Sequence, residues 1–163
     1  MYNQPRIETI RELKLIGKRI VTSIANNQTF QLWSSFMPRR KEIKNQCTNN
    51  LFSVQVYPPS FDFTFAELSV PFEKWATVEV DSFDTVPDGM ESFILQGGLY
   101  AVWDYRGLNN DTKIFEHIYG EWLPNSTTYC LDNRPHFEIL GEKYKNNHPD
   151  SEEEIWIPIK MIG

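Results

Sequence analysis

Several short segments of the chain alternate hydrophobic with polar residues, which is the pattern of half-buried β-strands. The alternation is clearest over residues 51–57, where Phe52, Val54 and Val56 share one face. By the same reasoning, the remaining strands are predicted at residues 7–10, 13–23, 75–80, 93–96, 99–105, 136–140 and 154–159. We expect the first two of these to pair with each other. Residues 61–70 fit either a short strand or an ordered loop.

Two other segments have helical spacing. In the first, apolar residues at positions 29 or 30, 32, 33, 36 and 37 follow Asn26 and Asn27, either of which can cap a helix, and Pro38 is expected to end it. The second follows Asn110 and Asp111 and is expected to end at Pro124. Its apolar stripe consists of Ile114, Phe115, Ile118, Tyr119 and Trp122.

The two predicted helices contain related sequences. Residues 32–38 read LWSSFMP and residues 118–124 read IYGEWLP. The strands around each helix repeat as well, so the chain divides into pseudo-repeats at about residues 5–83 and 92–161. We therefore predict one α+β domain over residues 1–163, built from duplicated ββαββ units. Its antiparallel sheet would have about eight strands, with two main helices on one face and a cleft between the halves.

Charge and composition narrow the classes of partner. A net charge of −6 disfavours a nucleic-acid-binding surface, and the basic cluster Arg39, Arg40 and Lys41 is expected to form a charged helix end. Only two cysteines occur, and no segment resembles a signal peptide or a membrane span. These features predict a cytoplasmic protein that binds neither nucleic acid directly nor a membrane.

Familiar catalytic and metal-binding motifs are missing from the sequence. The three histidines, His117, His136 and His148, lack ligand spacing, so no metal is expected. There is no nucleophile elbow, phosphate-binding loop or zinc-protease motif, so neither a cofactor nor a catalytic residue is assigned.

The aromatic share of the sequence, 14%, suits either a dense core or a pocket for a flat ligand. Alternation puts Glu154 and Trp156 on one strand face, where a carboxylate beside an indole could hold a cation. An exposed edge strand is the alternative, and a register shift by one would replace Glu154 with Glu153. The predicted ligand-binding residues are Glu154, Trp156, Trp33, Trp103, Tyr105 and Tyr119. Trp33 and Tyr119 are expected to face each other across the cleft.

Residues 32–43, 98–107 and 154–159 together resemble the GyrI-like effector-binding domain of AraC-type and MerR-type bacterial transcription activators. The resemblance implies a pseudo-twofold fold with a cleft between the helices, floored by the sheet. It also implies binding of hydrophobic, often cationic, aromatic compounds by aromatic walls and a glutamate, which maps onto Glu154. Some relatives of this kind hydrolyse strained cyclopropane-bearing compounds with a tyrosine and a glutamate. Here Glu154 with Tyr105 or Tyr119 would correspond.

Three functions follow as hypotheses. Because no DNA-reading helix precedes the first strand, we expect a stand-alone, effector-sensing or multidrug-binding protein for hydrophobic cationic aromatic small molecules. The alternatives are a hydrolase of strained electrophiles in the same cleft and an inhibitor module that binds a protein partner.

Overall fold

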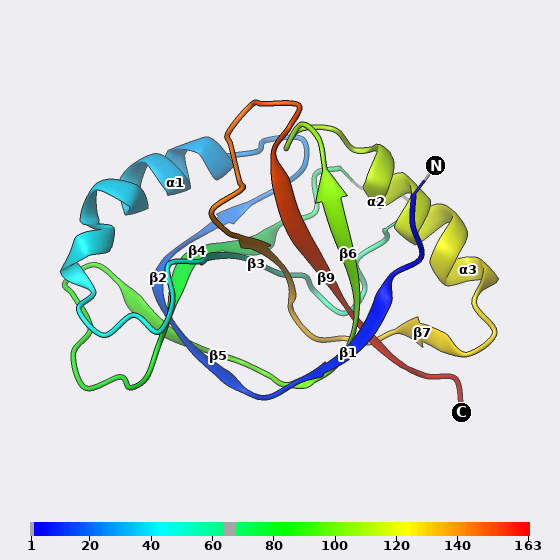
Figure 1. The fold of residues 1–163 in the computed structure, drawn as a ribbon, viewed down its shortest axis with the longest axis horizontal. Coiled ribbons are helices and arrows are strands. Elements are labelled where there is room, and N and C mark those ends of the chain that lie inside the picture. Colours follow the sequence, from blue (N-terminus) through cyan, green and yellow to red (C-terminus); the bar gives the residue numbers. More distant parts are fainter. Residues whose placement is uncertain (1, 64–67) are drawn as a thin grey trace.

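A computed structural model describes residues 2–63 and 68–163, and confirms the predicted α+β fold (Figure 1). Nine strands of the described chain form one antiparallel sheet, and the helical segments lie on one side of it. The strands are β1 (Arg6–Ile10), β2 (Leu13–Thr22), β3 (Leu51–Val56), β4 (Phe72–Val80), β5 (Glu91–Leu95), β6 (Gly98–Arg106), β7 (Tyr129–Leu131), β8 (His136–Leu140) and β9 (Glu152–Met161). In the described part of residues 61–70 the chain forms turns and loop, and residues 64–67 lie outside the described residues.

Each half contributes one helical segment, and both segments start in the same way. In α1 (Thr29–Phe36) the backbone N–H of Thr29 donates to Asn27 Oδ1 at 3.0 Å. In α2 (Lys113–His117) the N–H of Lys113 donates to Asp111 Oδ1 at the same distance, 3.0 Å. The predicted asparagine and aspartate at the two helix starts therefore satisfy equivalent backbone donors.

The predicted helix end at Pro38 is wrong. A 3₁₀ turn, η1 (Met37–Glu42), continues α1 past Pro38, which lies in its first turn, where the missing N–H of proline costs nothing. The second helical segment continues through a π-turn, η2 (Ile118–Trp122), and a last short turn, α3 (Leu123–Asn125), so it ends one residue after Pro124. None of the described helices is long and apolar enough to cross a membrane.

The sheet order is β1-β6-β9-β8-β3-β4-β2-β5, and this order is symmetric about its centre, where β8 pairs with β3. The expected hairpin between the first two strands is wrong, because β1 pairs with β6 of the second half and β2 pairs with β4 and β5. One register runs along both pairs, from Arg6 opposite Val102 to Leu13 opposite Leu95. Two residues between β1 and β2 keep the chain running forward instead of reversing it, so the halves exchange their edge strands.

Three apolar clusters hold the layers together. The cluster of Leu15, Trp75, Tyr100, Phe137 and Trp156 contains no helix residue, so it lies on the face of the sheet that the helices leave free. The other two clusters lie beneath the helices, one under α1 and one under α2–α3. Because these two clusters remain separate, the central strands β3 and β8 between them can present polar side chains to the helix-facing side.

Close strand packing explains one glycine. A Cβ added to Gly17 of β2 would meet the backbone oxygen of Ala76 in β4, so a side chain at this position would push the two strands apart. Glycine is the residue that allows such a close approach of two backbones.

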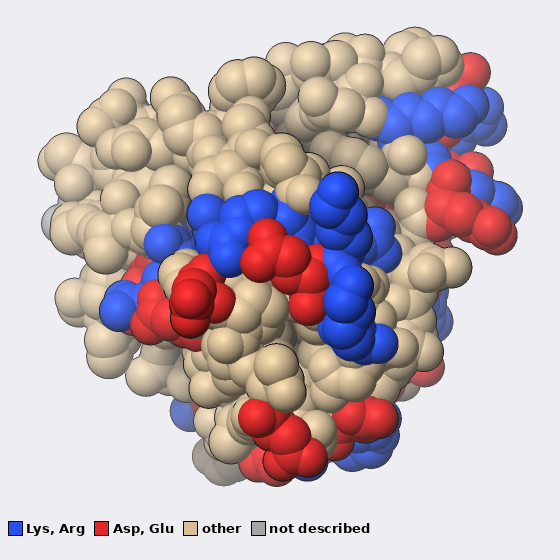
Figure 2. All heavy atoms as spheres, turned by 90° about the vertical axis from the view of Figure 1, so that its left-hand side faces the viewer, with Lys and Arg blue, Asp and Glu red and all other residues tan. Residues whose placement is uncertain are grey.

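Basic and acidic side chains lie side by side on the face of the molecule that is on the left in Figure 1 (Figure 2). Arg39 pairs with Glu42 at 2.7 Å and Arg19 with Glu91 at 2.9 Å. The cations Arg39, Arg40 and Lys41 occupy the last turn of η1, which confirms the predicted charged helix end. This face therefore presents mixed charge and not a continuous basic surface.

Candidate functional site

Four polar residues cross the middle of the sheet on its helix-facing side. They are Lys74 of β4, Gln55 of β3, Glu138 of β8 and Glu153 of β9, which are four neighbouring strands. We call these four residues the central polar row. Gln55 lies directly opposite Lys74 in the ladder of β3 and β4. Their apolar neighbours Val54 and Phe137 belong to the cluster on the other face, so strand alternation turns the row toward the helices.

The side-chain amide of Gln55 contacts both Lys74, the basic residue of the central polar row, and Glu138, one of its two acids. In the orientation that satisfies both neighbours, the amide nitrogen donates to Glu138 Oε2 at 2.9 Å and the amide oxygen accepts from Lys74 Nζ. Lys74 keeps only 8% of its surface exposed and Gln55 only 6%. A buried ammonium group needs such partners, because burial without them is costly.

An aromatic group borders the row. It comprises Tyr57, Phe61, Phe63, Phe72, Tyr119 and His136, and we call it the central aromatic cluster. The ring of Phe63 stacks on Tyr119 at 4.7 Å between centroids and on His136 at 5.0 Å. The hydroxyl of Tyr119 lies 2.8 Å from His136 Nδ1. The rings of Phe63, Tyr119 and His136 therefore contact one another pairwise, and His136 lies opposite Gln55 of the central polar row in the ladder of β3 and β8.

Burial shifts the protonation equilibria of the row. Loss of solvent raises the pKa of Glu153 to about 8, and the nearby Glu138 carboxyl adds to the shift. Burial also raises the pKa of Glu138 and lowers the pKa of Lys74, while each of these two groups partly offsets the effect on the other. For His136, burial and the charge of Arg134 lower the pKa to about 3, so its imidazole is neutral at physiological pH.

Glu154 lies in a different environment from the one predicted for it. Glu154 and Trp156 do share a face, as predicted, but it is the face away from the helices. The Trp156 ring stacks on Phe137 at 5.2 Å and its Nε1 donates to Glu154 Oε1 at 3.0 Å. Glu154 also pairs with Arg6 at 3.2 Å. The helix-facing acid of β9 is Glu153, because the chain places the isoleucines of β9, Ile155, Ile157 and Ile159, beneath α2–α3.

The other four predicted residues all lie on the helix-facing side, but in different places. Tyr119 belongs to the central aromatic cluster, and Tyr105 lies opposite Glu153 in the ladder of β6 and β9. Trp103 packs edge-on against Trp122 under the second helical segment. Trp33 packs edge-on against Phe36 of α1. Contact of any of the six residues with a ligand stays a prediction.

Sequence reasoning missed the polar members of the site. Gln55 and Glu138 each lie between two apolar residues of their strand, and Lys74 shares a strand face with Phe72 and Ala76. These positions are the signal that could have found them. His136 was considered only as a metal ligand. Among the described residues, no group of three or more His, Cys, Asp or Glu side chains is arranged to hold a metal ion.

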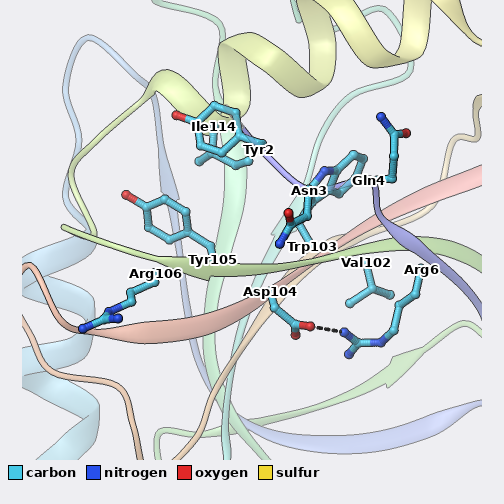
Figure 3. Close-up of a pocket in the computed structure, with 10 residues that line it drawn as sticks. All are labelled: Tyr2, Asn3, Gln4, Arg6, Val102, Trp103, Asp104, Tyr105, Arg106 and Ile114. Atoms are coloured by element: carbon cyan, nitrogen blue, oxygen red, sulfur yellow. Dashed lines mark hydrogen bonds and ion pairs between the residues drawn. The ribbon is translucent and has the colours of Figure 1, made fainter.

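A cavity of about 290 Å³ lies apart from the row, beside β6, α2 and the segment before β1 (Figure 3). It is lined by Tyr2, Gln4, Trp103, Tyr105 and Ile114, among others. At one side of it Arg6 donates to Asp104 Oδ2 at 2.6 Å. This outer cavity combines aromatic walls with amide groups and an exposed ion pair, and it provides a second place to be tested for ligand binding.

A family model described as an integron-associated effector binding protein, Cass2, matches residues 6–159. The chain belongs to this effector-binding family. The match covers both halves and agrees with the resemblance to GyrI-like effector-binding domains inferred from the sequence.

Solved structures share the fold of this family member. The C-terminal domain of EcmrR is 11% identical with a TM-score of 0.71, covering 98% of each chain. SAV2435 bound to tetraphenylphosphonium is 13% identical with a TM-score of 0.67, covering 97% of this chain and 94% of that one. A hydrolase encoded by lin2189 from Listeria innocua is 11% identical with a TM-score of 0.60, covering 96% of this chain and 92% of that one. No curated protein sequence matches the chain. At these identities the likeness shows the fold alone.

Proposed function

We propose that this effector-binding protein binds hydrophobic, cationic aromatic small molecules between its two helical segments. The central polar row supplies the negative charge, and the central aromatic cluster supplies the flat apolar faces. The observation that carries the proposal is an excess carboxyl group: half-buried Glu153 interacts with Glu138, and the charge of Glu138 also acts on Tyr57 and Tyr119 of the central aromatic cluster.

Charge and shape both favour such a ligand. The row contains two acids and one base, so a cation can neutralise the second acid. Aromatic faces attract organic cations through their quadrupoles, and the attraction strengthens where water is excluded. Phe63 stacks on both Tyr119 and His136, and this supports the proposal that a phenyl group of a ligand can pack against these two rings. SAV2435, which shares the fold, was solved with a tetraphenyl cation, and this supports the choice of ligand class.

Calorimetric titration with tetraphenylphosphonium tests this function. Wild-type protein should bind it saturably, and Glu138→Gln should raise the dissociation constant at least about tenfold, because the substitution removes a desolvated charge of the row but keeps its shape. Glu154→Gln is the matched control, since this carboxylate lies on the opposite face of the sheet. Its affinity should equal that of wild type. Absence of saturable binding, or loss of affinity in Glu154→Gln but not in Glu138→Gln, contradicts the proposal.

A hydrolytic activity is the second candidate. Two carboxyl groups in one enclosed site, one of them with a pKa near 8, form the arrangement that general acid–base chemistry uses. The fold is also shared with the Listeria innocua hydrolase. Turnover of a cyclopropane-bearing electrophile by wild type, lost in Glu138→Gln while binding persists, would support hydrolysis. No turnover alongside tight binding of tetraphenylphosphonium would leave binding as the function.

A further inference from the structure

The charges of the central polar row do not balance when every group is ionised. Lys74 supplies one positive charge, and Glu138 and Glu153 supply two negative charges. Lys74 and Glu138 both contact the amide of Gln55, so these two groups form the neutral pair. Glu153 lies on β9, three strands away from the strand of Lys74. At about 4.8 Å per strand, this places the two backbones about 14 Å apart.

Among the described residues, Lys74 is the cation whose charge acts on Glu153, and it acts on Glu138 as well, so two acids share one positive charge. Tyr105 lies opposite it on β6, and Glu138 faces it from β8. Among the described residues, three tyrosines also interact with the two acids, namely Tyr57, Tyr119 and Tyr144. Burial raises the pKa of each of these tyrosines above its ordinary value, so they stay neutral below about pH 10. The imidazole of His136 is also neutral, because its pKa is lowered to about 3.

A partly buried acid that shares its one neighbouring cation with a second acid has two ways to avoid an unbalanced charge: it holds a proton, or it pairs with a positive ligand. We propose that the site exchanges these two, so that Glu153 is protonated when the site is empty and releases its proton to solvent when a monocation binds. The O–H bond of the carboxylic acid breaks, the proton goes to the buffer, and the ligand's charge takes its place. This inference rests on the proposed function and adds its regulation by pH.

Competition between proton and cation determines how affinity depends on pH. Below the pKa of Glu153 in the empty protein, each unit of pH should change the affinity roughly tenfold, in favour of binding at higher pH. Above about pH 8 the acid is already ionised, so affinity should level off. A neutral ligand of similar shape should show neither effect, because it does not replace the proton.

Titration of tetraphenylphosphonium in phosphate and in Bis-Tris, two buffers with different ionisation enthalpies, measures the proton directly. At about pH 6.5 wild type should release close to one proton per ligand bound. Triphenylphosphine oxide is the neutral control ligand and should release none. Glu153→Gln should bind the cation at least about tenfold more weakly than wild type at pH 9, with no release and no pH dependence. Glu154→Gln should behave as wild type.

The outcomes separate the two proposals. If tetraphenylphosphonium binds with the same affinity from about pH 6 to pH 9 and no proton is released, the exchange is wrong while the binding function stands. If the cation fails to bind at every pH, the binding function fails and the exchange with it.

A second measurement covers the case in which Glu153→Gln does not fold. The ¹³C carboxyl resonance of Glu153 in wild type should titrate near pH 8 without ligand and below about pH 6 with saturating tetraphenylphosphonium. A titration that does not move when the ligand is added overturns the exchange.

Discussion

Glu153 is the residue whose protonation state determines the electrostatics of the site. Loss of solvent and the neighbouring Glu138 carboxyl raise its pKa to about 8, so at neutral pH its side chain is a hydrogen-bond donor. The adjacent residue on the same strand, Glu154, has a different environment, with an ion pair to Arg6 and an indole donor from Trp156. Because successive side chains of a strand point to opposite sides, these two consecutive carboxyl groups lie on opposite faces of the sheet.

The raised pKa of Glu153 predicts how stability varies with pH. In the unfolded chain this carboxyl ionises near its ordinary value, whereas in the folded protein it keeps its proton up to about pH 8. The unfolded state therefore binds fewer protons between these values, and the free energy of unfolding should fall as pH rises through this window. Glu153→Gln removes the titrating group. Its stability relative to wild type should rise by about 4 kcal/mol between about pH 5 and pH 9, measured by urea unfolding.

If the free energies of unfolding of Glu153→Gln and wild type differ by a constant amount from about pH 5 to pH 9, the prediction is contradicted. Glu154→Gln again serves as the control, since it removes a neighbouring carboxylate of the same strand that faces the other way. The free energy of unfolding of Glu154→Gln relative to wild type should not rise with pH in the way expected for Glu153→Gln.

At the scale of elements, the segment that follows β3 places Phe63 against Tyr119 of η2 and His136 of β8, with centroids 4.7 Å and 5.0 Å apart. In the proposed binding mode, a ring of the ligand takes the place of Phe63. Phe115 of α2 also stacks on Tyr119, with centroids 6.5 Å apart, but it comes from the helix and belongs to the cluster under that helix. In the proposed binding mode, Phe63 competes with the ligand for Tyr119, and Phe115 forms part of the wall.

Removing the competing ring should strengthen binding. We expect Phe63→Ala to lower the dissociation constant for tetraphenylphosphonium several-fold, because the ligand no longer has to displace a ring. Phe115→Ala is the matched control and should leave the affinity unchanged or weaken it. A Phe63→Ala variant that binds more weakly than wild type would show that Phe63 is a wall and not a competitor. Fluorescence or calorimetric titration at one pH is sufficient for this comparison.

Strand alternation explains which features of the elements could be predicted from sequence. The alternation of Phe52 and Val54 correctly placed one face of β3. Residue type alone predicted a side-chain acceptor at each helix start, at Asn26 or Asn27 and at Asn110 or Asp111, and in the structure Asn27 and Asp111 accept from the backbone. The choice between Glu153 and Glu154 depended on which face of β9 the helices cover. This is a tertiary contact, made by Ile155 and its neighbours with α2–α3, and the sequence of a single strand does not determine it.

At the scale of the whole molecule, the two halves form one sheet with a symmetric strand order but an asymmetric site. The duplication was visible in the sequence, whereas the exchange of β1 and β5 between the halves was not, because it depends on pairing between segments far apart in the chain. Lys74 comes from the first half and both acids come from the second. The charge that would attract a cation is therefore not repeated by the symmetry of the fold.

The location of a bound cation tests the central claim most directly. Tetraphenylarsonium has the shape and charge of tetraphenylphosphonium, and arsenic gives an anomalous X-ray signal that identifies its position in a crystal. We predict one strong anomalous peak between the helical segments, beside Glu138 and Glu153 and in contact with the central aromatic cluster. A peak only in the outer cavity beside Trp103, or no peak in crystals soaked at a concentration that saturates the protein in solution, would contradict the account.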